Sequence, residues 1–182
     1  MSRDLYIVFT HGTGWFSKSI EVVEELGEKI HGDNGVEFLP THTGMAEEKK
    51  FQEAITSGFV GNNIARYKPE NMRVYKLTVD DEDLVKAGDA KFNNLLGLPY
   101  SPKALVCGAA YTLFDEVLPG AVGENDCSAD VSDILRSYGF DILPEVPASS
   151  ITPNILIGII DKIGTPIDPA YLITELSEKE AC

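Results

Sequence analysis

The stretch Asn125-Asp126-Cys127-Ser128 holds the side chain with the most evident chemical use, a cysteine placed where a helix should begin. Asp126 and Asn125 are both good N-cap residues, so we expect Cys127 in the first turn of the following helix. There the free backbone amides and the positive end of the helix dipole favour a thiolate and could stabilise an oxyanion. The alternative is that Cys127 is a small buried hydrophobe, as most free cysteines are. The carboxylate of Asp126 also opposes a thiolate, unless it is engaged as the cap.

A thiol nucleophile needs a base, and the chain has three histidines that could serve. His31 comes at the predicted end of a helix, where a cation is favourable. His11 follows an apolar run that should be a strand, and it could lie near a site. His42 lies within Pro40–Ala46, a run of mostly small residues that could hold an imidazole ring. We therefore expect His42 to be the base.

Glu53 follows His42 by eleven residues, with a charged run at 47–50 between them. If that run is a hairpin turn, positions 42 and 53 fall nearly opposite each other on one face, with Cβ atoms about 5 Å apart. A carboxylate there would accept the ring N–H and fix the tautomer, as the third member of a catalytic triad does. The segment 51–55 also fits a surface helix, in which Glu53 would be solvated; we favour the strand.

Strands and separate helices that position these groups predict an α+β fold. The apolar runs and alternating patterns predict strands at Leu5–Phe9, Phe38–Ala46, Phe51–Ile55 and Met72–Val79. Apolar spacing predicts helices at Phe16–Ile30 (apolar at 20, 23, 26 and 30), Ala104–Leu118 and Asp126–Tyr138. Start signals predict three more: one capped by Asp80 or Asp81, and two that begin at the Thr-Pro and Asp-Pro pairs at 152–153 and 168–169.

Composition excludes several classes of function. The 182 residues suit one domain, and the net charge of −14 argues against binding nucleic acid or an anionic membrane surface. No apolar run approaches the ~20 residues of a membrane span, and no signal peptide is evident, so we expect a cytoplasmic protein.

Three cysteines without paired spacing argue against disulfides and zinc; Cys107 lies in an apolar run typical of a core, and Cys182 ends the chain. Gly12-x-Gly14 lacks the third glycine of a dinucleotide site.

Six short segments between about residues 4 and 157 occur in an order that resembles the permuted NlpC-like cysteine peptidases, most closely their YiiX-like branch. They are Gly12–Lys18 after the first strand, Thr41–Met45, Phe51–Ala54, Leu95–Tyr100, Asn125–Ser128 and Ile151–Leu156. The chain departs from that branch in its long segment at 110–124. It also departs at Ala129-Asp130, where the branch often has Glu-Leu.

The resemblance implies a papain-like, circularly permuted fold, in which an antiparallel sheet packs against helices and the histidine strand precedes the cysteine helix. It implies a hydrolase domain at 1–165, with 166–182 as a helical tail of the same domain. It further implies acyl transfer by Cys127, His42 and Glu53, without a metal or organic cofactor. Tyr100 and Ser128 are then expected at the substrate, although Tyr100 could equally be a core tyrosine.

The expected partner is a small-molecule or peptide substrate. Relatives of this kind suggest peptidoglycan-type peptides or small acyl amides and esters, and we favour the latter because an acidic protein is repelled by anionic wall polymers. Two other hypotheses remain: a binding module that kept the fold and lost turnover, and an assembly protein that self-associates. The reactivity of Cys127 separates the enzyme from both.

Overall fold

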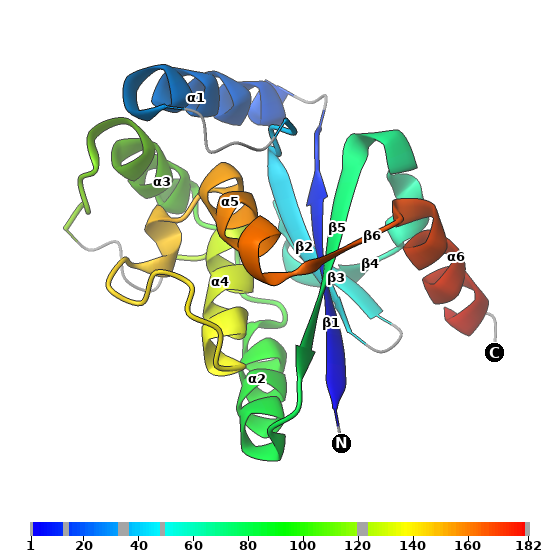
Figure 1. Ribbon diagram of the computed structural model, residues 1–182. Coiled ribbons are helices and arrows are strands. Elements are labelled where there is room, and N and C mark those ends of the chain that lie inside the picture. Colours follow the sequence, from blue (N-terminus) through cyan, green and yellow to red (C-terminus); the bar gives the residue numbers. More distant parts are fainter. Residues whose placement is uncertain (1, 13–14, 33–36, 48–49, 120–123, 181–182) are drawn as a thin grey trace.

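The computed structural model describes residues 2–12, 15–32, 37–47, 50–119 and 124–180. Within these ranges the chain has an α+β fold, with a six-stranded antiparallel sheet and six α-helices (Figure 1). The strands are β1 (Arg3–Thr10), β2 (His42–Glu47), β3 (Lys50–Ile55), β4 (Gly58–Asn62), β5 (Met72–Val79) and β6 (Thr165–Ile167). The helices are α1 (Trp15–His31), α2 (Glu82–Leu95), α3 (Pro102–Phe114), α4 (Cys127–Ser137), α5 (Pro153–Ile163) and α6 (Pro169–Glu180), with 3-10 turns η1 (Ile64–Arg66), η2 (Pro69–Asn71) and η3 (Ala148–Ser150).

The strand order is β4-β3-β2-β1-β5-β6, with every neighbouring pair antiparallel. The apolar first strand lies inside the sheet, where β2 and β5 cover its two edges. The predicted strands in β1, β3 and β5 are confirmed, and residues 51–55 are therefore strand rather than helix. The sequence prediction did not include β4 or β6.

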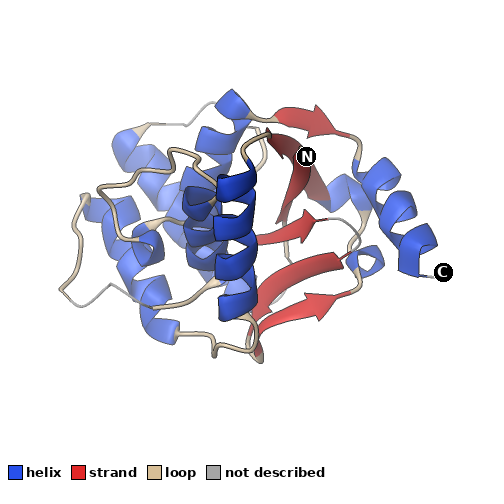
Figure 2. Ribbon diagram, turned by 90° about the horizontal axis from the view of Figure 1, so that it is seen from below, coloured by secondary structure: helices blue, strands red, loops and turns tan. Residues whose placement is uncertain are grey.

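Side chains alternate between the two faces of the sheet, and each face carries its own core. Leu5 and Ile7 pack on the face covered by α2, α4 and α5, and α1 packs against α3. Val8 faces the other way and packs with Leu172 and Leu176 of α6. Figure 2 shows the sheet between the larger helical layer and α6.

Local cap residues account for most helix starts. The Asp81 carboxylate accepts the backbone N–H groups of Asp83 and Leu84 at the start of α2, and the Thr152 hydroxyl accepts that of Ile155 at the start of α5. These residues satisfy amides that the helix itself leaves without a partner. The predicted helix starts at these positions are confirmed.

Two predicted boundaries are wrong. The strand expected from Phe38 begins only at His42, because Pro40 has no N–H for a ladder and Thr41 makes only an initial hydrogen bond to Thr10. Helix α3 begins earlier than expected, at Pro102, and ends at Phe114 rather than Leu118. Its end is set by Asp115, which adopts a left-handed conformation with φ of 54°.

The buried side of α1 also differs from the apolar spacing that predicted it. Leu26 and Ile30 are 45% and 51% exposed, whereas Glu24 is 1% exposed. Gly27 explains the orientation, because a Cβ at this position would overlap the Thr112 side chain of α3. The helices approach each other along this glycine, and Glu24 is carried inward with it.

The segment after residue 165, expected as a helical tail, contributes to the second face of the sheet. Strand β6 pairs with Val74–Lys76 at one edge, and α6 covers the core around Val8. In the described parts of the chain, no helix combines the length and apolar character needed to cross a bilayer.

Candidate active site

Cys127 is the first residue of α4 as predicted, and of the two candidate caps it is Asp126 that caps this helix. The Asp126 carboxylate accepts the Ala129 N–H at 2.7 Å and the Ser128 hydroxyl at 3.0 Å. Burial raises the pKa of Asp126 to about 6, and these hydrogen bonds oppose a larger rise. The carboxylate next to the cysteine is thus engaged as the cap, which is the condition that a thiolate at this position requires.

Helix α4 is held in place by its apolar side. Val131, Ile134 and Leu135 are fully buried, and the helix packs against β2 and β3. The side chain of Cys127 is part of the same core and is 3% exposed. This packing gives the sulfur a fixed position near His42, the first residue of β2.

His42 contacts both other members of the predicted triad. Its Nε2 atom lies 2.6 Å from Oε2 of Glu53, and its ring also hydrogen-bonds with the Cys127 side chain. Because the carboxylate occupies Nε2, the Nδ1 atom is left for the sulfur. Burial alone would lower the pKa of His42, but the charges and hydrogen bonds of Cys127 and Glu53 raise it to about 10. The contact therefore favours an imidazolium facing the sulfur.

Glu53 is fully buried, yet its carboxylate is surrounded by donors. Oε2 also accepts the Tyr67 hydroxyl at 2.5 Å, and Oε1 lies 3.2 Å from Nη2 of Arg66. The Arg66 guanidinium stacks over the Tyr67 ring, 4.9 Å from its centroid. Burial acts to raise the pKa of Glu53, but His42, Tyr67 and Arg66 outweigh it and lower this pKa. Glu53 is thereby held as an anion against the imidazole.

The hairpin register differs from the expected one by two residues. The turn at 47–50 is confirmed, with Glu47 paired to Lys50, but it places Gly44 rather than His42 opposite Glu53. His42 and Gly44 point to the same face, so His42 reaches Glu53 as a diagonal neighbour. A Cβ at position 44 would overlap the Phe51 ring, so the close packing here requires glycine. Residues 48 and 49 lie outside the described ranges.

Tyr100 and Ser128, which we expected at the substrate, both lie close to Cys127. Burial and the charges of Cys127, Asp126 and Asp130 raise the pKa of Tyr100, so its hydroxyl stays protonated and can donate a hydrogen bond. Ser128 is 1% exposed, and its hydroxyl donates to the Asp126 cap. Ser128 thus contributes to the helix start, and it also lines the cavity beside the sulfur.

A cavity of about 290 Å³ opens beside Cys127, near the lower end of the range for small-molecule pockets. Its walls come from α1, α3 and the first turns of α4 and α5, with apolar side chains such as Val23 and Leu105. His42 does not line this cavity, whereas Cys127 does. The sulfur is therefore the link between the histidine and the space that a ligand could fill.

The other histidines and cysteines lie elsewhere. His11 Nδ1 is 3.0 Å from the carbonyl oxygen of Leu39, and exposed His31 contacts the carbonyl oxygen of Leu113. Cys107 is fully buried, and burial raises the pKa of its thiol; Cys182 lies outside the described residues. Among the residues that the structure describes, no group of three His, Cys, Asp or Glu side chains could hold a metal ion.

Sequence reasoning missed Arg66, Tyr67 and Glu24. A buried carboxylate at Glu53 signalled that donors must lie nearby, but their identity depends on how β4 and η1 return the chain to the sheet. Glu24 carried no signal of its own, because it follows Val23 and precedes Glu25 in an ordinary amphipathic pattern.

Comparison with known proteins gives no family for this chain. No family model matches the chain, and no curated protein matches it.

Proposed function

We propose that this protein is a cysteine hydrolase that cleaves an amide or ester bond by acyl transfer. Cys127 is the nucleophile, His42 is the base, and Glu53 orients His42. The observation that carries the proposal is the chain of contacts from Glu53 through His42 to Cys127, which ends at a cavity.

In the starting state the Cys127 proton lies on His42, and in the first half-reaction the thiolate attacks the carbonyl carbon of the substrate. The carbonyl electron pair moves onto oxygen. The Asp126 cap takes the N–H groups of Ser128 and Ala129, which leaves the Cys127 N–H at the helix start for this oxyanion. The bond to the leaving amine or alcohol then breaks, and His42 protonates the leaving group.

In the second half-reaction, a water molecule gives a proton to His42 and its oxygen attacks the thioester carbon. Collapse of this intermediate breaks the C–S bond and releases the carboxylic acid. The sulfur departs as a thiolate while His42 keeps its proton, which restores the starting ion pair. Throughout, the Glu53 carboxylate stabilises the imidazolium and holds Nε2, so that Nδ1 handles the proton.

We also infer that the α+β fold is papain-like with a circularly permuted order of elements. What supports this is the order along the chain, in which the strand that begins at His42 and the Glu53 strand precede the helix that begins at Cys127. The same helix packs against both strands. The substrate class we favour is a small acyl amide or ester, since the cavity beside the sulfur suits one small group better than an extended peptide.

The test is the reactivity of Cys127. At about pH 6, where an ordinary thiol is almost wholly protonated, iodoacetamide should alkylate Cys127 much faster than Cys182, as measured by mass mapping. The matched variant His42→Gln should slow alkylation of Cys127 and leave Cys182 unaffected. Alkylation of Cys127 at the rate of Cys182 would contradict the proposal and favour a binding or assembly protein.

A further inference from the structure

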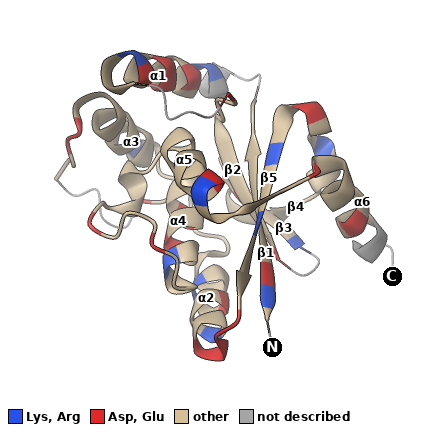
Figure 3. Cartoon of the chain, in the orientation of Figure 1, with Lys and Arg blue, Asp and Glu red and all other residues tan. Residues whose placement is uncertain are grey.

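The cavity beside Cys127 has apolar walls and a carboxyl group. Ile20 and Val23 of α1 and Leu105 and Val106 of α3 supply apolar surface. Glu24 lines the same cavity and is 1% exposed. Figure 3 shows that α3 and α5, which border the cavity with α1, carry few charged residues. A carboxyl group buried among apolar side chains is unfavourable unless a partner stabilises it.

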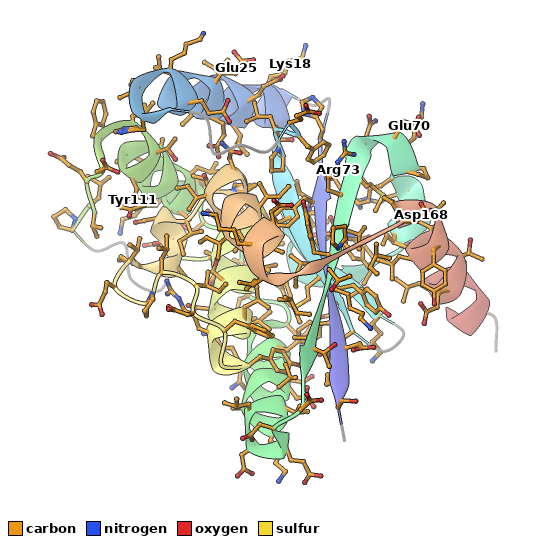
Figure 4. All side chains as sticks on the ribbon, in the orientation of Figure 1. Lys18, Glu25, Glu70, Arg73, Tyr111 and Asp168 are labelled. Carbon is orange, nitrogen blue, oxygen red and sulfur yellow. The ribbon has the colours of Figure 1, made fainter. Side chains whose placement is uncertain are left out.

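The inward position of Glu24 contrasts with that of its neighbour Glu25. Glu25 is exposed, and in Figure 4 it projects from the outer side of α1 together with Lys18. Glu24 is turned inward beside Gly27, where α1 meets α3. The two residues are chemically identical and adjacent, so they form a natural pair for experiment.

Within the described ranges, neither carboxylate oxygen of Glu24 has a hydrogen bond of normal length and angle. The amide of Asn154, which lies nearby, donates to Glu28 at 3.0 Å. Burial raises the pKa of Glu24 to about 7, and contacts with Thr152 and Asn154 only partly oppose this rise. The carboxyl group therefore lacks the strong donor that a buried anion requires.

The charges around the cavity favour a cationic donor. The lining residues include Glu24 and Asp126 but no Lys or Arg among those described, and Glu28 adds a further negative charge near Glu24. An anionic ligand group would be repelled. An ammonium group would supply both the charge and the hydrogen bonds that Glu24 lacks.

We propose that the part of the substrate that occupies this cavity is a short apolar chain ending in a primary amine, and that Glu24 binds that amine. The inference rests on the proposed function for the bond that is cleaved. The apolar walls of α1 and α3 enclose the methylene chain, and the ammonium group pairs with the Glu24 carboxylate. Glu24 is then a specificity residue, which contacts the substrate away from the reacting atoms.

Binding tests the proposal without turnover. In the full chain carrying Cys127→Ala, 6-aminohexanamide should bind at least about tenfold more tightly than hexanamide by isothermal titration calorimetry. Adding Glu24→Gln should remove this preference, whereas adding the matched control Glu25→Gln should keep it. Equal binding of the two amides before any change at Glu24, or a preference that persists in Glu24→Gln, would overturn the proposal. The first of these outcomes does not depend on Glu24→Gln folding.

Turnover provides a second measure with the same pair of groups. The ratio of kcat/KM for p-nitrophenyl 6-aminohexanoate over p-nitrophenyl hexanoate should fall about tenfold in Glu24→Gln. The two proposals fail separately. Glu24-dependent amine binding with an unreactive Cys127 rejects the hydrolase and keeps the amine site. A reactive Cys127 with no amine preference rejects the amine site and keeps the hydrolase.

Discussion

Glu53 and Glu24 are two equally buried carboxyl groups with opposite properties. Glu53 is 0% exposed and Glu24 is 1% exposed. Hydrogen bonds from His42 and Tyr67 and the charge of Arg66 keep the pKa of Glu53 below its ordinary value despite burial. Among the described residues Glu24 has no oppositely charged partner and only contacts with Thr152 and Asn154, so burial raises its pKa to about 7. Whether a buried glutamate is a fixed anion or a titrating acid is therefore decided by its hydrogen-bond partners and not by its depth.

Asp126 and Asp130 extend the comparison. Asp126 has the Ala129 N–H and the Ser128 hydroxyl as donors, and burial raises its pKa to about 6. Asp130 has an oxygen without a partner in the described residues, and burial raises its pKa to about 8. The neighbouring charges of Asp126 and Asp133 add to the rise in the pKa of Asp130. The site thus contains one carboxylate fixed as an anion against the histidine and others whose charge depends on pH or a ligand.

The largest expected effect is on catalysis. Glu53→Gln keeps the shape of the side chain but removes its charge and offers the wrong group to Nε2, so kcat/KM for p-nitrophenyl hexanoate should fall roughly 10³-fold or more. Glu24→Gln should cost far less on this amine-free ester, because Glu24 does not touch His42 or the sulfur. A loss in Glu53→Gln of less than about tenfold would mean that Glu53 does not orient the base.

The next effect is the dependence of stability on pH. The native pKa of Glu24 is raised from 4.5 to about 7, so the native state binds more protons than the unfolded state between these values, and stability falls as pH rises through them. Urea unfolding should show that Glu24→Gln gains up to about 3 kcal/mol relative to the parent between about pH 5 and pH 8. Exposed Glu25→Gln is the control and should show no such gain. A parallel pH profile for Glu24→Gln and the parent would refute the assignment.

Features that depend on residues close together in the sequence could be predicted from it. The starts of α2, α4 and α5 follow from caps that satisfy amides within their own first turn. The sequence left Asp80 or Asp81, and Asn125 or Asp126, open as the capping residue. Pairing of His42 with Glu53 was predicted in outline, since one hairpin joins them. The exact register was not, because the pairing of Glu47 with Lys50 places Gly44 opposite Glu53.

Features that depend on contacts between elements could not be predicted. The donors Arg66 and Tyr67 reach Glu53 only after β4 and η1 have folded back on the sheet. The orientation of α1 is set by the approach of Gly27 to Thr112, which overrides the apolar pattern that marked Leu26 as buried. For the same reason Glu24 looked like a surface glutamate until α3 was in place.

A smaller effect isolates one donor of Glu53. Because its pKa is lowered in the native state, Glu53 contributes stability that is present above its unfolded pKa and is lost as pH falls through the native one. Tyr67→Phe removes the hydroxyl and keeps the ring, and should cost about 2 kcal/mol at neutral pH. Urea unfolding should show the difference shrinking at acidic pH. Tyr171→Phe on the exposed side of α6, at a residue 57% exposed, is the control.

The smallest effect concerns the Asp126 carboxylate beside Cys127. Ser128→Ala removes one of the donors of Asp126 and leaves the backbone bond from Ala129, so the cap should weaken by about 1 kcal/mol in urea unfolding. The pKa of Asp126 should rise further, because burial is then less opposed. Since the Ser128 hydroxyl faces the cap, alkylation of Cys127 by iodoacetamide at about pH 6 should change less than about threefold. A large loss of reactivity would instead mean that this hydroxyl contacts the sulfur. Asp126 would then no longer be intermediate between Glu53 and Glu24 in how far hydrogen bonds oppose the effect of burial on its pKa.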